Sequence, residues 1–403
     1  MAIKVKVGLI GALDMLKFKN MAKVRENVIQ AAPANEITAD YAINNHAKAL
    51  HPDFQELVID KVIEHEGAGA KTFLMRSKDG GPLAYFRAGQ YLSLKLAIGG
   101  SSVSRPYSIS SAPKDALKGV VSVTVRSNPG GFAAGYMLDE FKEGDAVLSS
   151  GPQGNFYYEP LRDPEHIVAL AGGSGITPFL SMAQAIADGT EDFDLTILFG
   201  SRTRENILFK EELDELAAKC SKIHVVHVLS DEKADGFENG FITADLIRKY
   251  AKAPYSVFVC GPEAMYKFLV GELDKLGLPK KNIRCEMLGV TKKIAEHDGF
   301  PVEAQGKTFA IKVRQGAAEY DIKASAEEPI LVAVERAGLT APSRCRSGEC
   351  GWCRSKVLSG TYFAPAENEN RRWADVRWDY IHPCATFPTS DMVIEVPAEY
   401  VPK

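Results

Sequence analysis

Four cysteines in the C-terminal part of the chain have the spacing of metal ligands. Cys345, Cys350 and Cys353 form a Cys-x4-Cys-x2-Cys pattern, and Cys384 follows on a later segment. A [2Fe-2S] cluster needs four thiolates, and this spacing places three of them on a single tight loop. Zinc also binds four thiolates, but zinc sites usually pair two short cysteine knuckles, and the sequence has only one. The pattern therefore favours a [2Fe-2S] cluster over zinc.

A second group of residues could bind a flat, phosphorylated molecule. Arg105-Pro106-Tyr107-Ser108 follows residues 89–96, which alternate like a strand. Arg105 carries a planar charge that suits a phosphate oxygen. Tyr107 offers a ring that can cover an aromatic cofactor, and Ser108 adds a small hydrogen-bonding group beside it. A strand end with a surface arginine is the alternative interpretation.

Two glycine-rich turns that lead into helices could bind further phosphates. They cover residues 128–138 and 171–178. Backbone N–H groups and the positive end of a helix favour an anion at such a turn, although a tight strand-to-helix connection is the alternative. The candidate residues are Gly130, Gly131, Phe132, Ala133 and Ala134 in the first turn and Gly172, Gly173, Ser174, Gly175, Ile176 and Thr177 in the second.

The elements that must position these residues differ along the chain. Short alternating strands predict an antiparallel barrel. They are expected near 56–63, 72–76, 84–87, 89–96 and 120–126. Continuous apolar strands that alternate with helices then predict a parallel sheet covered on both faces. They are expected at 167–170, 195–199, 223–228 and 255–259. A hairpin over 309–322 and a helix over 330–338 precede the cysteines.

Composition narrows the class of protein. The 403 residues predict two or three domains, and 45% hydrophobic residues with 25% charged residues are typical of a soluble globular protein. A net charge of −4 indicates neither nucleic acid nor a membrane surface as a partner. No apolar run is long enough for a transmembrane segment. Seven cysteines, four of them with metal spacing, predict a cytoplasmic protein with free thiols.

Taken in order, these motifs resemble two known families. Residues 54–290 resemble the ferredoxin–NADP reductase family of flavoproteins, and residues 303–400 resemble plant-type [2Fe-2S] ferredoxins. The resemblance implies a multidomain chain: a helical extension (1–53), an antiparallel FAD-binding β-barrel (54–160), an α/β parallel-sheet NAD(P)-binding domain (161–288), a linker (289–302) and an α+β, β-grasp ferredoxin domain (303–403). Pro33 separates two possible helices, 15–30 and 37–49, in the extension, which is expected to be a cap on the flavin domain or a partner- or membrane-binding segment.

The resemblance also implies roles for single residues. Arg105 to Ser108 and the turn with Gly130 to Ala134 would hold the flavin. FAD is favoured over FMN, because relatives that use FMN carry a different second phosphate loop. Ala134, which replaces the family's Ser or Thr, keeps the choice open. The turn from Gly172 to Thr177 would hold the dinucleotide, while Cys260, Gly261, Pro262 and Met265 would lie near its nicotinamide, with Cys260 as a buried core residue the alternative. Glu286 would be the acidic residue that ends the last strand, unless it is only a surface charge.

The resemblance leaves the choice between NADH and NADPH open. Ser201 and Arg202 follow the second strand of the predicted parallel sheet. A basic residue there accepts a 2′-phosphate, whereas an acidic one favours NADH. Arg202 and Arg204 therefore lean toward NADPH, but arginines that cap a surface turn are equally consistent with the pattern.

These modules together predict a converter of electron pairs into single electrons. A hydride carries two electrons, whereas a [2Fe-2S] cluster takes one at a time, and a flavin between them can do both. The function implied is an NAD(P)H-dependent reductase with Ser108, Cys260 and Glu286 at the reacting centre and a protein electron acceptor, such as an oxygenase component. The alternatives are an electron-input subunit of a larger redox complex and a flavin and iron–sulfur redox sensor.

Basic and aromatic residues crowd the sequence around the cysteines. They are Arg344, Arg346, Trp352, Arg354, Arg371, Arg372, Trp373, Arg377 and Trp378. One hypothesis is a basic, aromatic rim that docks an acidic partner, because Trp and Arg are common anchors at interfaces. The alternative is that the arginines bind carbonyl groups and the tryptophans pack the ferredoxin domain onto the flavin domain.

Overall fold

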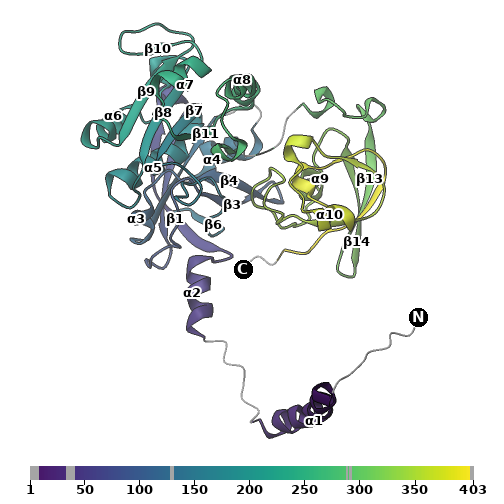
Figure 1. Cartoon of the computed structure of the whole chain (residues 1–403). Coiled ribbons are helices and arrows are strands. Elements are labelled where there is room, and N and C mark those ends of the chain that lie inside the picture. Colours follow the sequence, from purple (N-terminus) through teal and green to yellow (C-terminus); the bar gives the residue numbers. More distant parts are fainter. Residues whose placement is uncertain (1–8, 33–40, 128–130, 287–288, 290–292, 400–403) are drawn as a thin grey trace. The chain divides into compact units, whose positions relative to one another are not determined.

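The computed structural model describes residues 9–32, 41–127, 131–286, 289 and 293–399. The chain divides into two compact units, Met1–Lys48 and Ala49–Lys403. The smaller unit contains helix α1 (Leu9–Ala31), and α2 (Ala42–Leu50) begins in it (Figure 1). Both helices were expected, although residues 37–40 of the second lie outside the described residues. No helix in the described part of the chain is both long enough and apolar enough to cross a membrane.

The first domain of the larger unit is built on a six-stranded antiparallel sheet, as expected for the flavin barrel. Its strands are β1 (Gln55–His65), β2 (Ala70–Ser77), β3 (Tyr91–Ile98), β4 (Ser101–Ser108), β5 (Val120–Arg126) and β6 (Ala146–Ser149), in the order β4-β3-β6-β1-β2-β5. Helices α3 (Pro113–Ala116) and α4 (Phe132–Glu140) lie in its connections. Alternate strand residues such as Leu57, Phe73, Leu94 and Val123 meet in one buried core, which explains the alternating pattern in the sequence.

The strand predicted at 84–87 is wrong. This segment is irregular, although Ala84 and Phe86 are buried and the residue between them is not. The backbone N–H of Ala84 donates to Oε1 of Gln55 at 2.9 Å instead of pairing with a strand. Burial of every second side chain in a loop therefore imitated the pattern of a strand.

The second domain is a parallel α/β sheet, also as expected. Its strands are β7 (His166–Gly172), β8 (Asp194–Ser201), β9 (Ile223–Leu229), β10 (Glu238–Asn239), β11 (Tyr255–Cys260) and β12 (Ile283–Glu286), in the order β10-β9-β8-β7-β11-β12. The helices are α5 (Thr177–Ala187), α6 (Lys210–Lys219), α7 (Ala244–Tyr250) and α8 (Glu263–Asp274). Separate apolar clusters include Ile167 and Ala169 in one and Val168 and Leu170 in the other, so both faces of the sheet are buried.

The third domain has a mixed five-stranded sheet and matches the expected β-grasp pattern. Strands β13 (Thr308–Gln315) and β14 (Ala318–Ser325) form the predicted hairpin, and β13 is parallel to β19 (Met392–Glu395). The sheet is completed by β15 (Ser355–Ser359) and β17 (Tyr380–Ile381), and β16 (Tyr362–Phe363) pairs separately with β18 (Phe387–Pro388). Helix α9 (Ile330–Arg336) supplies core residues, and the short α10 (Trp373–Arg377) follows β16 (Figure 1).

The segment expected to be a linker packs against the third domain. Ile294 and Phe300 are buried in one apolar cluster with Ala326 and Phe387. The charged composition of residues 289–302 gave no indication that Ile294 and Phe300 would be buried. The domain bounds given by the resemblance stay a prediction.

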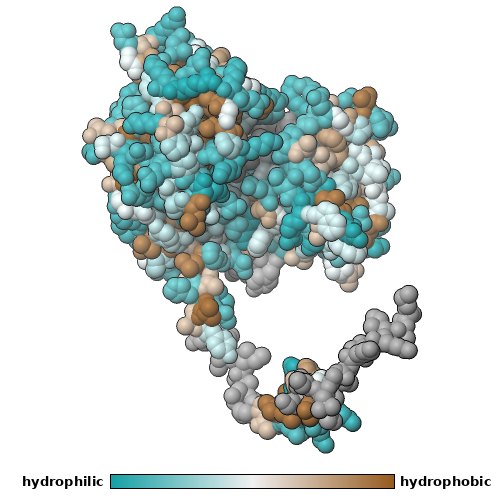
Figure 2. Space-filling view, in the orientation of Figure 1, coloured by the Kyte–Doolittle hydropathy of each residue, from teal (hydrophilic) through white to brown (hydrophobic). Residues whose placement is uncertain are grey.

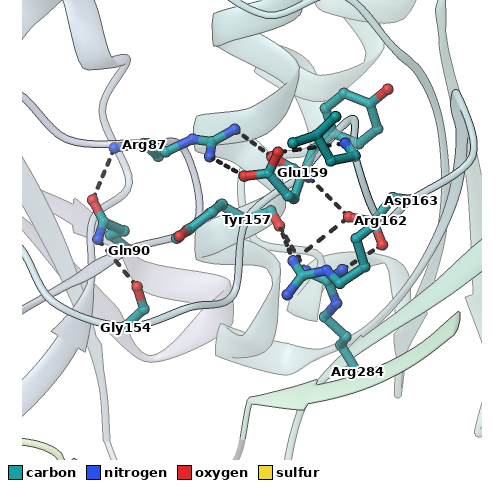
Figure 3. Close-up of polar contacts among 10 residues, drawn as sticks. Arg87, Gln90, Gly154, Tyr157, Glu159, Arg162, Asp163 and Arg284 are labelled. Carbon is teal, nitrogen blue, oxygen red and sulfur yellow. Dashed lines mark hydrogen bonds and ion pairs between the residues drawn. The ribbon is translucent and has the colours of Figure 1, made fainter. Parts of the chain in front are cut away.

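A polar network joins the barrel to the parallel sheet through the connection after β6 (Figure 3). Arg87 binds Glu159 at 2.9 Å and lies over the ring of Tyr157, with 4.1 Å between the guanidinium carbon and the ring centre. Gln90 accepts from the backbone of Arg87 and donates to the carbonyl of Gly154 at 3.1 Å. Both partners of Gln90 lie on loops, so the network fixes the chain path between the two sheets.

Arg284 on β12 binds the same connection from the side of the parallel sheet (Figure 3). It donates to the carbonyl of Tyr157 at 2.8 Å and forms an ion pair with the fully buried carboxylate of Asp163. Away from such contacts, hydrophilic side chains dominate the face of the larger unit that Figure 2 presents, with hydrophobic residues scattered among them.

Candidate functional site

The four candidate cluster ligands gather on one loop and one short helical turn. Cys345, Cys353 and Cys384 are buried and Cys350 is exposed, and none of the four forms a disulfide. The sulfur atoms of Cys353 and Cys384 are 3.4 Å apart. The backbone N–H groups of Ser347 and Cys350 point at the sulfur of Cys345 at 3.5 and 3.3 Å. Backbone donors aimed at a cysteine sulfur fit an iron–sulfur cluster, because hydrogen bonds to the sulfurs help to set its potential.

The loop can close in this way only because a glycine occupies position 348. Gly348 has a φ of +81°, and a Cβ atom there would lie 2.5 Å from the carbonyl oxygen of Asn368. Ser347 Oγ, His382 Nε2 and Asn368 Oδ1 are buried beside the loop without a hydrogen-bond partner among the described residues. Buried polar atoms are normally paired, so these side chains fit a site that is completed by a polar group such as the cluster.

The three residues expected at the reacting centre lie together. Ser108, which ends β4, donates from Oγ to Oε2 of Glu286 at 3.0 Å. Glu286 ends β12, where it pairs in register with Cys260 at the end of β11. Burial raises the pKa of Glu286 to about 8, against the lowering effect of the Ser108 hydroxyl. Burial also raises the pKa of the Cys260 thiol well above its ordinary value. Below its pKa, Glu286 is a neutral carboxylic acid beside Ser108 and Cys260.

The candidate flavin-binding segment lies on β4. Arg105 is largely buried, and this burial lowers its pKa to about 10. The carboxylate of Glu335 lies 3.9 Å away, so the charge of Arg105 is only partly compensated by the described residues. Such a guanidinium fits a phosphate. Tyr107 packs at the edge of the barrel core, with its pKa raised to about 12 by burial.

Only part of the first glycine-rich turn is described. Gly130 lies outside the described residues. Gly131 precedes α4, which begins at Phe132, and the side chains of Ala133 and Ala134 pack against the barrel core. The helix start expected at this turn is therefore present, with its N-terminus at the segment proposed to bind phosphate.

A cleft of about 550 Å³ opens at the carboxyl ends of the parallel strands. This is the edge of an open α/β sheet at which ligands bind. Its lining includes the predicted residues Gly172, Gly173, Ser201, Arg202, Pro262 and Met265. The predicted residues Ser174, Gly175, Ile176, Thr177, Cys260 and Gly261 do not line it. Ser201 Oγ is buried without a partner among the described residues, which fits a ligand hydroxyl or phosphate oxygen.

The glycines of the second turn bring two strand ends and a side chain close together. Gly173 has a φ of +55°, and a Cβ atom there would lie 2.6 Å from Nη1 of Arg126. A Cβ atom on Gly175 would lie 2.1 Å from the carbonyl oxygen of Cys260. Gly175 therefore allows the turn after β7 to pack against the end of β11.

Among the residues that line this cleft, sequence reasoning missed Arg126, Phe241 and Phe268. Arg126 reaches it from the end of β5, in the other domain, and Phe241 and Phe268 form a ring pair with centres 5.4 Å apart. Arg126 could have been noticed as the charged residue that ends a strong strand before a glycine-rich loop. The two phenylalanines carry no such signal, because they belong to separate segments that only the fold brings together.

The two arginines considered for coenzyme choice already have partners. Arg202 binds Asp231 at 3.0 Å, and Arg204 binds Glu232 at 2.6 Å. Arg202 lines the cleft, whereas Arg204 is not among its lining residues. A 2′-phosphate would therefore approach an arginine, Arg202, that is already paired with the carboxylate of Asp231.

Comparison with known protein families agrees with this arrangement. Residues 62–158 match the oxidoreductase FAD-binding domain, residues 169–270 match the oxidoreductase NAD-binding domain, and residues 314–389 match the 2Fe-2S iron-sulfur cluster binding domain. The three matches follow one another in the order that the resemblance implied.

Several relatives match this chain over most of its length. A component of the 1,2-phenylacetyl-CoA epoxidase of Escherichia coli is 30% identical over 86% of this chain and 98% of its own length. The glycine betaine monooxygenase reductase subunit of Chromohalobacter salexigens is 28% identical over 78% of this chain and 88% of its own. Phthalate dioxygenase reductase, whose structure is described as modular for electron transfer from pyridine nucleotides to [2Fe-2S], has the same fold, with a TM-score of 0.62 and 24% identity over 85% of this chain and 98% of its own.

The matched domains, their order and these relatives agree with the geometry at the strand ends and at the cysteine loop. The chain therefore belongs to the family of ferredoxin–NADP reductase-type flavoproteins with a C-terminal [2Fe-2S] ferredoxin domain, and it is an NAD(P)H-dependent electron-transfer reductase that uses FAD.

Proposed function

We propose that this chain is the reductase component of an oxygenase system and delivers single electrons to an oxygenase protein. The printed names of the E. coli, C. salexigens and phthalate dioxygenase relatives support an oxygenase as the acceptor. The observation that carries the proposal is the direct contact between the cysteine loop and the flavin barrel. Ser93 on β3 donates from Oγ to the carbonyl oxygen of Arg344, the residue before Cys345, at 3.0 Å.

The flavin and nucleotide are assigned to the residues expected from the sequence. Arg105 and the start of α4 would bind the flavin phosphates, and Tyr107 would cover the ring system. The cleft would hold the dinucleotide, with Gly172 and Gly173 positioned to bind its pyrophosphate. FAD, when bound, accepts an electron pair from the nicotinamide and returns the electrons one at a time.

Residues of the chain then orient and shield the reacting groups. Ser108 and Glu286 hold each other at one edge of the flavin site, where Glu286 below its pKa keeps a proton that it can donate in a hydrogen bond. Cys260, one strand away and almost fully buried, limits the access of water. Arg126 places a positive charge beside Gly173, where the pyrophosphate would lie.

Further contacts hold the cysteine loop on the barrel. Arg344 donates to the backbone carbonyl of Asp53 at 3.0 Å and lies 4.1 Å from the centre of the Trp352 ring. Lys95 forms a buried ion pair with Glu399. Ser93 and Lys95 lie two residues apart on β3, so one face of this strand carries these contacts to the third domain. Four proposed cluster ligands are thus held against the strand that pairs with the flavin-binding segment.

The structure divides the basic and aromatic residues near the cysteines into two groups. Arg344 and Arg346 are buried and bind groups in the interior. The side chain of Arg371 is only 8% exposed and binds Glu369. Arg372 and Trp373, by contrast, are 76% and 73% exposed. The contacts of the first group match the alternative interpretation of these residues.

We infer that an acidic surface of the acceptor docks on α10 and the residues beside it. Arg372, Trp373, Arg377 and Trp378 are exposed there. Arg354 and Arg372 both bind the buried Asp375, at 2.5 and 3.0 Å, so this surface is tied to the segment that follows Cys353. Two arginines and two tryptophans suit an acidic protein partner.

The proposal is tested by anaerobic reduction of the purified protein with NADH and with NADPH. Flavin and iron–sulfur absorbance must both bleach, and the reduced protein must then reduce a purified oxygenase component in single-electron steps. Exchange of Arg372 for glutamate should slow only the second reaction and reduce its dependence on salt. Bleaching of the flavin without bleaching of the cluster would disprove the electron path, and equal reduction of the oxygenase by the variant would disprove the docking surface.

A further inference from the structure

Three charged groups from two domains meet in the interior between the flavin segment and the cysteine loop. Glu335 on α9 binds Arg346 with both carboxylate oxygens, at 2.6 and 3.0 Å. Its Oε2 lies 3.9 Å from Nη1 of Arg105 on β4. The side chains of Glu335, Arg346 and Arg105 are only 4%, 10% and 23% exposed. Helix α9 also contacts β4 directly, so the approach is part of the domain contact.

Arg346 sits inside the cysteine loop, between Cys345 and Ser347. Its φ of +57° lies in the left-handed region, which non-glycine residues seldom adopt. A bidentate pair between a guanidinium and a carboxylate has a fixed planar geometry. By binding the side chain of Arg346, Glu335 therefore holds the loop in an uncommon backbone conformation.

The charges of this group do not balance. Two guanidinium groups share one carboxylate, and Glu335 is nearer to Arg346 than to Arg105. A second anion can therefore bind Arg105. In the proposed flavin site that anion would be a phosphate of FAD. It would compete with Glu335 for Arg105, and Glu335 would then bind Arg346 alone.

We propose that Glu335 is a positioning residue that links the flavin site to the cluster loop, by holding Arg346 while it shares its charge with Arg105. The inference rests on the proposed assignment of Arg105 to a flavin phosphate. It has two consequences. The docked position of the cluster loop, and with it electron transfer from flavin to cluster, depends on Glu335. FAD binding and the contact between Glu335 and Arg105 oppose each other, and this coupling is reciprocal.

The test exchanges Glu335 for glutamine, which keeps the shape of the side chain and removes its charge. The matched control is Glu328→Gln, which removes a carboxylate that binds Arg336 at 2.5 Å on the surface near α9. The first readout is release of FAD from the holoenzyme on dilution, followed by FAD fluorescence. Glu335→Gln should bind FAD at least about fivefold more tightly, because a competing charge is gone. Glu328→Gln should match the wild type.

The second readout is stopped-flow reduction by NADH. In Glu335→Gln, flavin reduction should keep its rate, while cluster reduction should slow by about tenfold or more, because the loop is displaced. An unchanged rate of cluster reduction would overturn the proposal. If the variant does not assemble its cluster, FAD release decides instead: tighter binding supports the proposal and unchanged binding overturns it.

A further variant separates failure of this inference from failure of the proposed flavin site. Arg105→Ala should weaken FAD binding strongly. If FAD affinity is the same in Arg105→Ala and the wild type, the assignment of Arg105 is wrong, and the coupling to FAD is overturned with it. A slow cluster reduction in Glu335→Gln would in that case still show that Glu335 positions the loop.

Discussion

At the scale of single residues, the proposed reacting centre combines a buried carboxyl, a hydroxyl and a thiol from three strand ends. Ser108, Cys260 and Glu286 are far apart in the sequence and meet because β4, β11 and β12 end at the same place. Burial is the main cause of the raised pKa of Glu286. The carboxyl is therefore neutral at pH values at which an exposed glutamate is ionised.

The raised pKa of Glu286 predicts a pH dependence. The pKa of about 8 means that the carboxyl loses its proton as the pH rises through that value. The negative charge then opposes the arrival of electrons at the flavin site, so flavin reduction by NADH should slow by up to about tenfold per pH unit above the pKa. Stopped-flow rates measured over this pH range test it. Glu286→Gln should remove the dependence, and an unchanged pH profile in the variant would contradict the assignment.

The pair of Arg202 and Asp231 predicts a change in coenzyme preference. Asp231→Asn should free Arg202 for a 2′-phosphate and remove a carboxylate that repels it. The ratio of kcat/KM for NADPH to that for NADH should rise about tenfold, as expected for one added charged hydrogen bond. The control is Glu232→Gln, which frees Arg204 outside the cleft lining and should leave the ratio unchanged. A shift in the control equal to that in Asp231→Asn would refute this explanation.

At the scale of elements, turns determine what the strands and helices can hold. Gly175 lets the turn after β7 pack against the end of β11, and Gly348 lets the cysteine loop close against Asn368. The backbone and side-chain groups that are proposed to bind the cofactors therefore owe their positions to these close approaches. Loss of one glycine should therefore act on a bound cofactor as well as on stability.

Gly348→Ala tests this expectation at the cysteine loop. The added methyl group would meet the Asn368 carbonyl at 2.5 Å, in a backbone conformation that alanine avoids. The variant should lose most of its iron and sulfide and about 1–3 kcal/mol of unfolding free energy. Gly316→Ala is the control, because Gly316 has a φ of +59° and no atom of the described residues lies within 4 Å of the added methyl group. It should cost only about 1 kcal/mol and keep the cluster. Equal iron content in both variants would argue against a role for the close approach.

At the scale of the whole molecule, buried ionic groups join domains that each have their own core. Arg284 and Asp163 fix the connection between the barrel and the parallel sheet, while Arg344 and Glu335 join the third domain to the barrel. Electron transfer requires the cofactors of separate domains to lie close together. These contacts therefore serve function as well as stability.

Arg284→Met tests the first of these contacts. It should destabilise the protein by about 3–5 kcal/mol, because the buried Asp163 carboxylate would lose its main partner. The control is Arg162→Met, since the more exposed Arg162 lies 3.6 Å from the same carboxylate and should contribute less than about 1 kcal/mol. Chemical unfolding of both variants measures the difference. Similar stabilities would show that Arg284 does not compensate the charge of Asp163.

Much of the architecture was predictable because the chemistry depends on residue types at short spacing. Three of the four cysteines, the two glycine-rich turns and the Arg105–Ser108 segment are each patterns within a few residues of the chain. Hydrophobic periodicity likewise distinguished the antiparallel barrel from the parallel sheet, since each fold buries a different set of side chains. Periodicity misled only where a loop buried alternate residues, at 84–87.

What the sequence alone determined was the set of modules, their order and the class of cofactor that each could hold. The tertiary structure decided which groups face one another: Arg126 with Gly173, Phe241 with Phe268, and Glu335 with both Arg346 and Arg105. It also decided which arginines near the cysteines are buried in a domain contact and which remain exposed. The physical reason is that these pairings join residues distant in the chain, and packing of whole elements, rather than local spacing, determines where such residues meet.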